Sequence, residues 1–271
     1  EILEENGVEV EGIHGYIDPY FGGVSPSCTE ENLAELKAHV VKTGCRLGLA
    51  TDGDGDRFGI IDEKGGFVHP NVILALLLDH LVRVKGWRGG VARSVTTTHL
   101  LDRIAARHGL PLMKTKVGFK YMADLFLRGE IMFGGEESAC IAVKDHLPEK
   151  DGIFAGLLVA EMIAASGRSL TALREDLFKE YGTVTSGQRT LALTPERAKR
   201  LRALVQSPPS KLGRRKVVAV ETIDGLKLDF EGDRWVVVRL SGTEPLIRCY
   251  AEAETREEVD AILNKGLETV R

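Results

Sequence analysis

Three aspartates alternate with two glycines in the segment Asp52-Gly53-Asp54-Gly55-Asp56-Arg57, which is the most chemically informative part of the chain. Like charges this close repel, and they raise one another's pKa unless a cation neutralises them. The glycines allow a tight turn that can bring the three carboxylates to one point. Carboxylate oxygens suit Mg²⁺ or Ca²⁺ better than zinc. We therefore predict a divalent metal site at Asp52, Asp54 and Asp56, with Arg57 placed to help hold a phosphate.

The hexapeptide 52–57 has two possible interpretations other than a metal loop between strands, namely an acidic surface turn and an EF-hand loop. An acidic surface turn would need no ligand, because Asp and Gly are ordinary turn residues. An EF-hand loop would place aspartates at positions 1, 3 and 5 and Glu63 at position 12, but it requires glycine at position 6, where the chain has Arg57. The flanking segments 46–50 and 58–62 also have the composition of strands rather than helices. A metal loop between two strands explains the pattern best.

A second group of polar residues lies in the segment 239–248, Arg-Leu-Ser-Gly-Thr-Glu-Pro-Leu-Ile-Arg. We expect a strand, a turn and a second strand here. Backbone N–H groups in such a turn form an anion-binding nest, and the hydroxyls of Ser241 and Thr243 add donors. Arg239 and Arg248 would lie on opposite arms of the hairpin and can bind phosphate oxygens in a bidentate manner. The alternative is a surface hairpin with ordinary turn residues, which the two flanking arginines make less favourable.

Weaker candidates follow two predicted strands of the middle part of the chain. Glu136 and Ser138 come directly after an apolar strand, at a strand end where α/β domains bind ligands. Adjacent glutamates are also common in solvated loops. Lys120 begins a predicted helix just after another strand, although a lone lysine there is more often solvated. His146 lies in a predicted loop, and a catalytic role for it stays open.

Composition limits the class of protein and its partners. The chain has 271 residues, of which 43% are hydrophobic and 28% charged, as in an ordinary globular protein with room for about two domains. Its formal net charge of -4 argues against nucleic-acid binding, and its longest apolar run, 72–78, is too short to cross a membrane. The four cysteines have no CxxC spacing, so we expect reduced thiols in a cytoplasmic protein.

Hydrophobic periodicity predicts two kinds of element order, which indicate an α/β fold followed by a small α+β domain. Before residue 181 strands and helices alternate: strands at 8–13, 46–50, 58–62, 91–95, 111–117 and 131–133, and helices at 30–43, 71–84, 98–108, around 122–126, 151–166 and 170–180. After it strands cluster: 190–193, 216–222, 226–229, 235–240 and 247–252, with helices at 194–205 and from 256 to the end.

Together these motifs resemble those of the α-D-phosphohexomutase family, whose members include phosphoglucomutase and phosphomannomutase. Four segments carry the resemblance, in the family's order: 52–57, 117–121, 135–138 and 239–248. The resemblance implies layered α/β domains and a last α+β domain of TATA-box-binding-protein-like topology around one cleft. Residues 1–85 would be a partial second domain that binds metal, 86–182 the third domain that binds sugar, and 183–271 the fourth domain that binds phosphate.

The resemblance also implies a role for each motif residue. Mg²⁺ would be bound by Asp52, Asp54 and Asp56 and would face a phosphoserine. Arg57 would assist near that phosphate, and Lys120 would lie near the reacting hydroxyl. Sugar hydroxyls would be bound by Glu136 and Ser138. The phosphate that is not transferred would be held by Arg239, Ser241, Gly242, Thr243 and Arg248.

The implied reaction is an isomerase reaction, the interconversion of hexose 1-phosphate and hexose 6-phosphate through a phosphoserine and a bisphosphate, with glucose as the expected sugar. Mg²⁺ and cationic side chains would neutralise charge on the transferring oxygens. Two alternatives stay open: a non-catalytic sugar-phosphate-binding or scaffolding protein, and a metal-dependent phosphatase with an aspartate nucleophile. No small hydroxyl residue follows the aspartates, which argues against the phosphatase.

The chain departs from the family pattern in two places. The family's nucleophile lies in a Ser-His-Asn-Pro type loop that is not found here, and Ser25-Pro26-Ser27 does not match it. The chain begins with Glu1 and then with what resembles the last turns of a helix, so we expect an inactive fragment that could associate with a missing N-terminal part or form a homodimer. Ala139-Cys140 replaces the Gly and His of many relatives, which leaves the general acid or base open.

Overall fold

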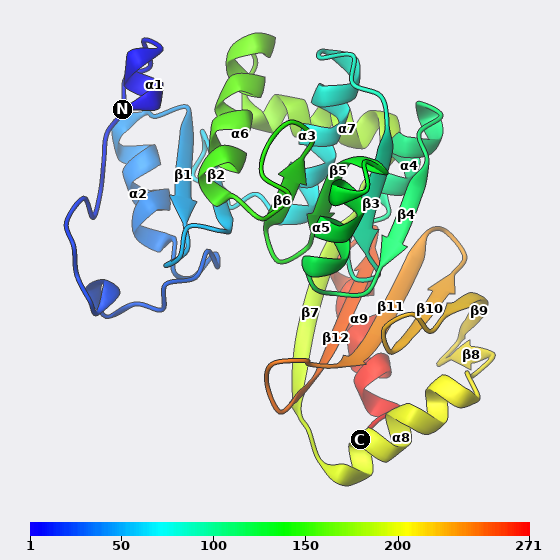
Figure 1. The fold of residues 1–271 in the computed structure, drawn as a ribbon. Coiled ribbons are helices and arrows are strands. Elements are labelled where there is room, and N and C mark those ends of the chain that lie inside the picture. The colour runs from blue at the N-terminus through cyan, green and yellow to red at the C-terminus, as the bar shows by residue number, and fades with distance from the viewer.

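Three β-sheets, of two, four and six strands, divide the chain into three parts (Figure 1). The computed structural model describes all residues from 1 to 271. An N-terminal part carries the two-stranded sheet, a central α/β part carries the four-stranded sheet, and a C-terminal α+β part carries the six-stranded sheet. This order agrees with the predicted change from alternating elements to clustered strands.

The first residues form the helix α1 (Ile2–Glu5) and then a long extended segment. Gly7 has a φ of 76°, and the N–H of Val8 donates to the carbonyl of Leu3 at 3.0 Å, as in a glycine-terminated helix end. The predicted strand 8–13 is wrong. Its residues have no partner strand and are largely exposed, so alternation alone could not make a sheet there. A short 3₁₀ turn, η1 (Phe21–Gly23), follows.

The two-stranded sheet is an antiparallel hairpin of β1 (Leu47–Thr51) and β2 (Phe58–Asp62), in which Thr51 pairs with Phe58. The predicted loop between two strands is therefore confirmed and comprises residues 52–57. The helix α2 (Ala34–Thr43) packs on this hairpin. Every residue of β2 is buried, because the helix α6 of the central part also packs against the hairpin.

The central sheet has the order β4-β3-β5-β6, in which β3 is parallel to β4 and β5, and β6 is antiparallel to β5. α5 covers one face, α3, α4 and α6 cover the other, and α7 packs on α3 and α4. The strand β6 was not predicted from the sequence. The elements are α3 (Pro70–Arg83), β3 (Gly90–Ser94), α4 (Leu100–Arg107), β4 (Leu112–Thr115), α5 (Lys120–Leu127), β5 (Ile131–Glu136), β6 (Cys140–Val143), α6 (Gly152–Ser166) and α7 (Leu170–Tyr181).

Helix α3 is buried along almost its whole length, as its apolar composition predicts. It packs against α4, α6 and α7, within a hydrophobic core that also includes Phe58 and Ile60 of β2. Packing thus places α3 with the central part, whereas the sequence-based limit after residue 85 places it in the first. No single helix is long and apolar enough to cross a membrane; α6 and α7 meet that test only together, across a bend of 85°.

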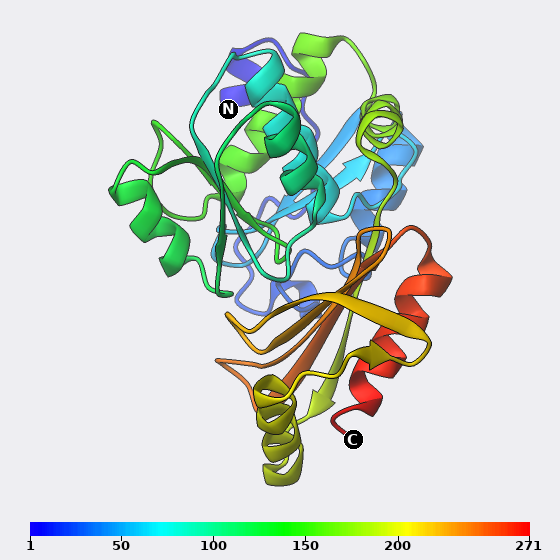
Figure 2. The ribbon, with the colours of Figure 1, turned by 90° about the vertical axis from the view of Figure 1, so that its right-hand side faces the viewer.

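The C-terminal sheet is antiparallel throughout and has the order β7-β12-β11-β10-β9-β8. Both helices pack on one face (Figure 2). Along β11, Val236 and Val238 face this core, while Trp235, Val237 and Arg239 face the opposite side. The elements are β7 (Thr185–Ala192), α8 (Pro195–Gln206), β8 (Lys211–Leu212), β9 (Arg215–Glu221), β10 (Leu226–Phe230), β11 (Arg234–Leu240), β12 (Leu246–Ala253) and α9 (Arg256–Glu268).

Candidate active site

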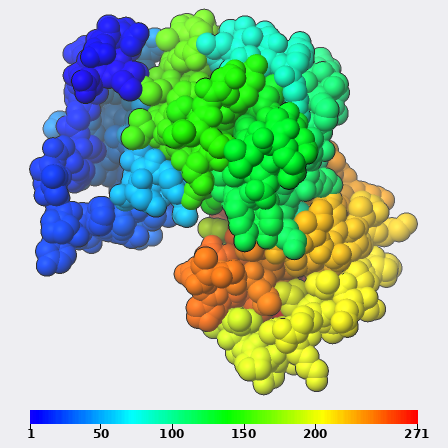
Figure 3. Space-filling view, in the orientation of Figure 1, coloured from blue at the N-terminus to red at the C-terminus, as the bar shows by residue number.

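One cleft of ≈ 580 Å³ lies where the three parts of the chain meet, and residues of all three parts line it. The space-filling view shows the hollow between the region of the aspartate loop and the orange loop of residues 241–245 (Figure 3). Eight of the predicted site residues line this cleft: Arg57, Glu136, Ser138, Arg239, Ser241, Gly242, Thr243 and Arg248. The fold therefore brings together motifs that are far apart in the sequence.

The three aspartates of the loop converge as predicted. One oxygen of each carboxylate can be chosen so that the three lie within 4.8 Å of one another. Gly55, with a φ of 76°, makes the turn possible. One oxygen of Asp56 is buried without a hydrogen-bond partner, and burial together with the neighbouring carboxylates raises the pKa of Asp52. These three carboxylates offer only oxygen ligands, carry excess negative charge and include one oxygen without a hydrogen-bond partner. Such a set of ligands fits Mg²⁺ or Ca²⁺.

Backbone contacts hold the aspartate loop in place. The N–H of Gly152, at the start of α6, donates to the carbonyl of Gly55 at 3.0 Å. A Cβ at position 152 would lie 2.2 Å from the carbonyl oxygen of Arg57, so only glycine permits this approach. On the other side, the N–H of Phe58 donates to the carbonyl of Ala139 at 3.3 Å. The loop is thus fixed between α6 and the turn that carries Ser138.

Two cationic side chains border the aspartate loop. The Nε of Arg57 lies 3.6 Å from both Asp52 Oδ2 and Asp56 Oδ1. Lys150 lines the cleft and forms an ion pair with Asp56. Lys150 was not predicted from the sequence, because a lone lysine in a loop before a helix has no distinguishing pattern. Both cations are placed where they can neutralise a phosphoryl group next to a metal ion.

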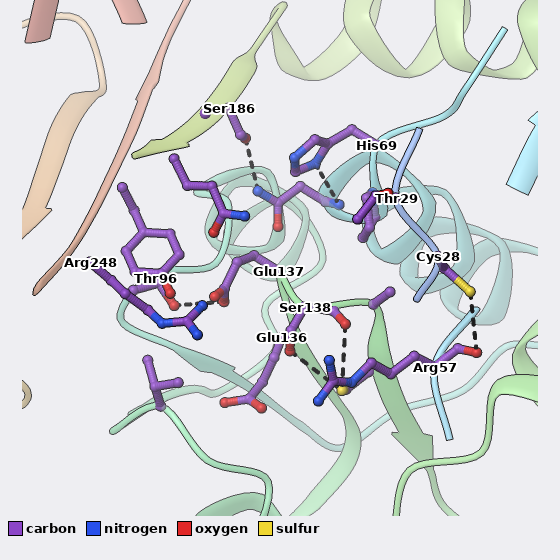
Figure 4. A pocket seen from close by; sticks show the side chains of 18 of the residues that line it. Cys28, Thr29, Arg57, His69, Thr96, Glu136, Glu137, Ser138, Ser186 and Arg248 are labelled. Atoms are coloured by element: carbon purple, nitrogen blue, oxygen red, sulfur yellow. Dashed lines mark hydrogen bonds between the residues drawn. The ribbon is translucent and has the colours of Figure 1, made fainter. Parts of the chain in front are cut away.

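Glu136 and Ser138 lie at the tight turn between β5 and β6 (Figure 4). Glu136 is the last residue of β5 and is 4% exposed. Its carboxylate accepts a hydrogen bond of 2.7 Å from the N–H of Gly118. Burial, and to a lesser extent the charge of Glu137, raises the pKa of Glu136 to about 7. Arg57 and Arg248 approach this turn from opposite sides (Figure 4).

The hairpin that was expected around residues 241–245 is present and is formed by β11 and β12. Arg239 and Arg248 are direct cross-strand partners, so their side chains lie on the same face of the sheet. Two like charges in this arrangement repel unless they are paired or bind an anion. Arg239 donates to a carboxylate of Asp224 at 2.9 Å, and Arg248 forms an ion pair with Glu244. The loop that follows Leu240 contributes Ser241, Gly242 and Thr243 to the same cleft. Within it, the N–H groups of Thr243 and Glu244 donate to Ser241 Oγ at 3.4 and 3.3 Å.

Asp52, Asp54 and Asp56 adjoin the cleft through Arg57 but do not line it themselves. Two further candidates, Lys120 and His146, lie outside this arrangement. Lys120, the first residue of α5, is exposed and does not line the cleft. Its ammonium lies 5.1 Å from the ring centre of Tyr121, and its catalytic role stays a prediction. His146 lies 2.9 Å from a carboxylate oxygen of Asp151 and stacks on Phe154 at 4.0 Å. These contacts account for His146 as a structural residue at the start of α6.

Family models match most of the chain. The model of phosphoglucomutase/phosphomannomutase alpha/beta/alpha domain II matches residues 1–66, that of domain III matches 69–181, and that of the C-terminal domain matches 193–266. The chain belongs to the phosphoglucomutase/phosphomannomutase family. The predicted family and the predicted fold class are thereby confirmed. The start of the domain III match at residue 69 agrees with the packing of α3.

Similar proteins carry several names within this family. A phosphoglucomutase/phosphomannomutase of Thermococcus kodakarensis is 33% identical over 266 residues, which are 98% of this chain and 56% of that protein. A probable phosphoglucosamine mutase of Methanopyrus kandleri is 31% identical over 270 residues, which are 100% of this chain and 58% of that protein. The chain thus spans a little over half the length of these relatives.

Solved structures of phosphohexomutases share the fold. A Thermus thermophilus protein, assigned as a phosphomannomutase, superposes with a TM-score of 0.82 at 32% identity, over 99% of this chain and 56% of that one. N-acetylphosphoglucosamine mutase of Aspergillus fumigatus, in complex with GlcNAc-6P and magnesium, gives a TM-score of 0.54 at 19% identity, over 82% and 48%. At this low identity the second likeness concerns the fold alone.

Proposed function

We propose that this chain supplies the metal-, sugar- and phosphate-binding parts of a phosphohexomutase, which interconverts hexose 1-phosphate and hexose 6-phosphate. One observation carries the proposal: Arg57 of the aspartate loop and Arg248 of the arginine hairpin line one cleft from opposite sides, and the buried Glu136 lies between them. A phosphatase or a surface acidic turn would not need a separate arginine pair facing the same cleft.

Each part of the cleft has a task in the proposed reaction. Asp52, Asp54 and Asp56 would hold Mg²⁺, which when bound stabilises negative charge on the transferring phosphoryl oxygens. Arg57 and Lys150 would add positive charge beside it.

The other two parts would fix the sugar phosphate for transfer. Glu136 and Ser138 would bind sugar hydroxyls, for which a buried carboxylate and an exposed hydroxyl are suited. Arg239 and Arg248, with Ser241, Gly242 and Thr243, would hold the phosphate that is not transferred. Because this phosphate site lies apart from the aspartate loop, either end of the sugar could be presented to the same metal ion. Lys120 is the weakest member of the proposal, because it faces Tyr121.

Three finer points belong to the same proposal. We propose glucose phosphates as the preferred sugars. Residues 1–271 alone would lack mutase activity, because they contain no Ser-His-Asn-Pro type segment to carry the phosphoryl group. The protein would act in the cytoplasm, because its four cysteines are free thiols.

Calorimetric titration of the chain with glucose 6-phosphate and Mg²⁺ tests the proposal. We expect binding of glucose 6-phosphate, none of glucose at the same concentrations, and at least about a 10-fold weaker affinity for Arg248→Ala, since a charge-assisted hydrogen bond is lost. Arg168→Ala is the matched control, because Arg168 pairs with Asp176 far from the cleft residues. Failure of every hexose phosphate to bind would defeat the proposal. If the chain is joined to a phosphohexomutase domain that carries the phosphoserine, and it binds hexose phosphates without converting them, the non-catalytic alternative is favoured.

A further inference from the structure

A chain of polar contacts connects the sugar-binding turn with the phosphate-binding hairpin. Asp224 lies in the turn between β9 and β10, and its Oδ2 accepts two hydrogen bonds, from Arg239 Nε at 2.9 Å and from the N–H of Val117 at 3.0 Å. The next N–H along the chain, that of Gly118, donates to Glu136 at 2.7 Å. We name this connection the Asp224 bridge. It joins a ligand-binding residue of the central part to one of the C-terminal part.

Backbone geometry fixes the position of Asp224. Gly225 has a φ of 85°, and a Cβ at this position would lie 2.4 Å from the carbonyl oxygen of Val238 and 2.7 Å from Arg239 Cβ. Only glycine therefore lets the turn lie directly against β11 at Arg239. Gly118, at the other end of the bridge, has a φ of 128°, which other residues rarely adopt. Both ends of the bridge thus depend on glycine.

The bridge places the negative charge of Asp224 beside the positive charge of Arg239. The side chain of Arg239 is only 9% exposed, and that of Asp224 is 20% exposed. Nε is the one guanidinium nitrogen of Arg239 that has a hydrogen-bond partner, so both Nη groups are available to an anion. Arg248 lies directly opposite on the neighbouring strand. Without Asp224, two cations would share one face of the hairpin and the orientation of Arg239 would be lost.

We propose that Asp224 is a positioning residue, which orients Arg239 toward the substrate phosphate and holds the phosphate-binding hairpin in register with the sugar-binding turn. Asp224 does not line the cleft, so it acts through Arg239 and through the 117–118 backbone. This inference rests on the proposed function, because it assumes that Arg239 binds a sugar phosphate.

Titration with glucose 6-phosphate tests the inference through Asp224→Asn, which keeps the side-chain shape and an acceptor for Val117 but removes the charge. We expect an affinity about 10-fold weaker than that of the wild type. Glu221→Gln is the matched control, because Glu221 pairs with Lys114 between the same two parts of the chain but does not contact Arg239. We expect it to change the affinity by less than about 2-fold. Should Asp224→Asn fail to fold in a thermal melt, Asp224→Ser replaces it.

A double-mutant cycle separates positioning from a general structural role. In an Arg239→Ala background, Asp224→Asn should weaken binding no further, because asparagine still accepts from the N–H of Val117 and the cation that the carboxylate orients is gone. Additive effects, or an equal effect of Glu221→Gln, would overturn the inference. A wild-type chain that binds no hexose phosphate would overturn the proposed function and this inference together. If the wild type binds and Asp224→Asn binds as tightly, the inference alone fails.

Discussion

Glu136→Gln is expected to make the protein more stable above neutral pH while it weakens sugar binding. Glu136 is 4% exposed, and burial is the main reason that its pKa rises to about 7; the negative charge of Glu137 adds to the rise. The hydrogen bond from the N–H of Gly118 to the carboxylate lowers the pKa of Glu136 and so opposes this rise. Glutamine has the shape of the protonated acid and keeps an oxygen that can accept from Gly118, so the variant mimics the uncharged state at every pH.

The magnitude follows from the two pKa values. The folded protein holds this proton with a pKa of about 7, whereas the ordinary value that applies to the unfolded chain is 4.5. Because the folded state binds the proton more tightly, the stability that is fully present below pH 4.5 is lost as the pH rises through 7. At about 1.36 kcal/mol per pH unit, the loss is about 3 kcal/mol. The variant should be more stable than the wild type by this amount at pH 8 and should match it near pH 4.5.

Urea denaturation at pH 5, 6, 7 and 8 measures the free energy of unfolding of the wild type, of Glu136→Gln and of Glu231→Gln. Glu231 is exposed in a turn outside the cleft and serves as the control. The reasoning would be refuted by a difference between Glu136→Gln and the wild type that does not change with pH, or by a variant that is less stable at pH 8. Calorimetry at pH 8 should show that the same variant binds glucose 6-phosphate more weakly.

Three further predictions concern the loops that border the cleft. Asp54→Asn should abolish the stabilisation of the wild type by Mg²⁺, which is about 2.7 kcal/mol at 100 times the Kd and raises the melting temperature; an unchanged rise, measured with and without EDTA, would contradict the metal site. Gly152→Ala should destabilise by about 3 kcal/mol because its Cβ would lie 2.2 Å from the carbonyl of Arg57. Gly156→Ala in the same helix, with its nearest neighbour 3.6 Å away, should stabilise by about 0.5–1 kcal/mol, and equal effects in denaturation would contradict the argument. Ala139→Gly should stabilise by about 1 kcal/mol, because a φ of 66° is unfavourable for alanine; a loss of unfolding free energy would count against it.

Local sequence patterns were sufficient to predict elements whose limits are set by neighbouring residues, such as a cap or a turn. The strand β2 was predicted with its observed limits, Phe58–Asp62, because an apolar β-branched run follows the aspartate loop directly. α6 begins after Asp151, whose side chain accepts from the N–H of Phe154 as an N-cap does. The cross-strand arrangement of Arg239 and Arg248 also followed from the turn residues between them.

Features that depend on tertiary contacts could not be predicted. β6 was missed because its turn, Glu137-Ser138-Ala139, contains no Gly, Asn or Pro, and Ala139 takes the left-handed conformation that glycine usually takes. The strand predicted at 8–13 had the right alternation but no partner strand. Lys150 and Asp224 are single charged residues in loops, and only the folded structure shows that they contact Asp56 and Arg239.

The three segments proposed to bind ligands share one construction, since each is the connection of an antiparallel hairpin: β1–β2, β5–β6 and β11–β12. The hydrogen bonds between the two strands restrain both ends of such a connection, so its local motion is small compared with that of a loop between unpaired segments. Adaptation to sugars of different size should therefore come from rigid-body rotation of the C-terminal sheet relative to the rest. Hydrogen exchange at the ladder amides would then change little when ligand binds, while the radius of gyration measured by X-ray scattering would decrease.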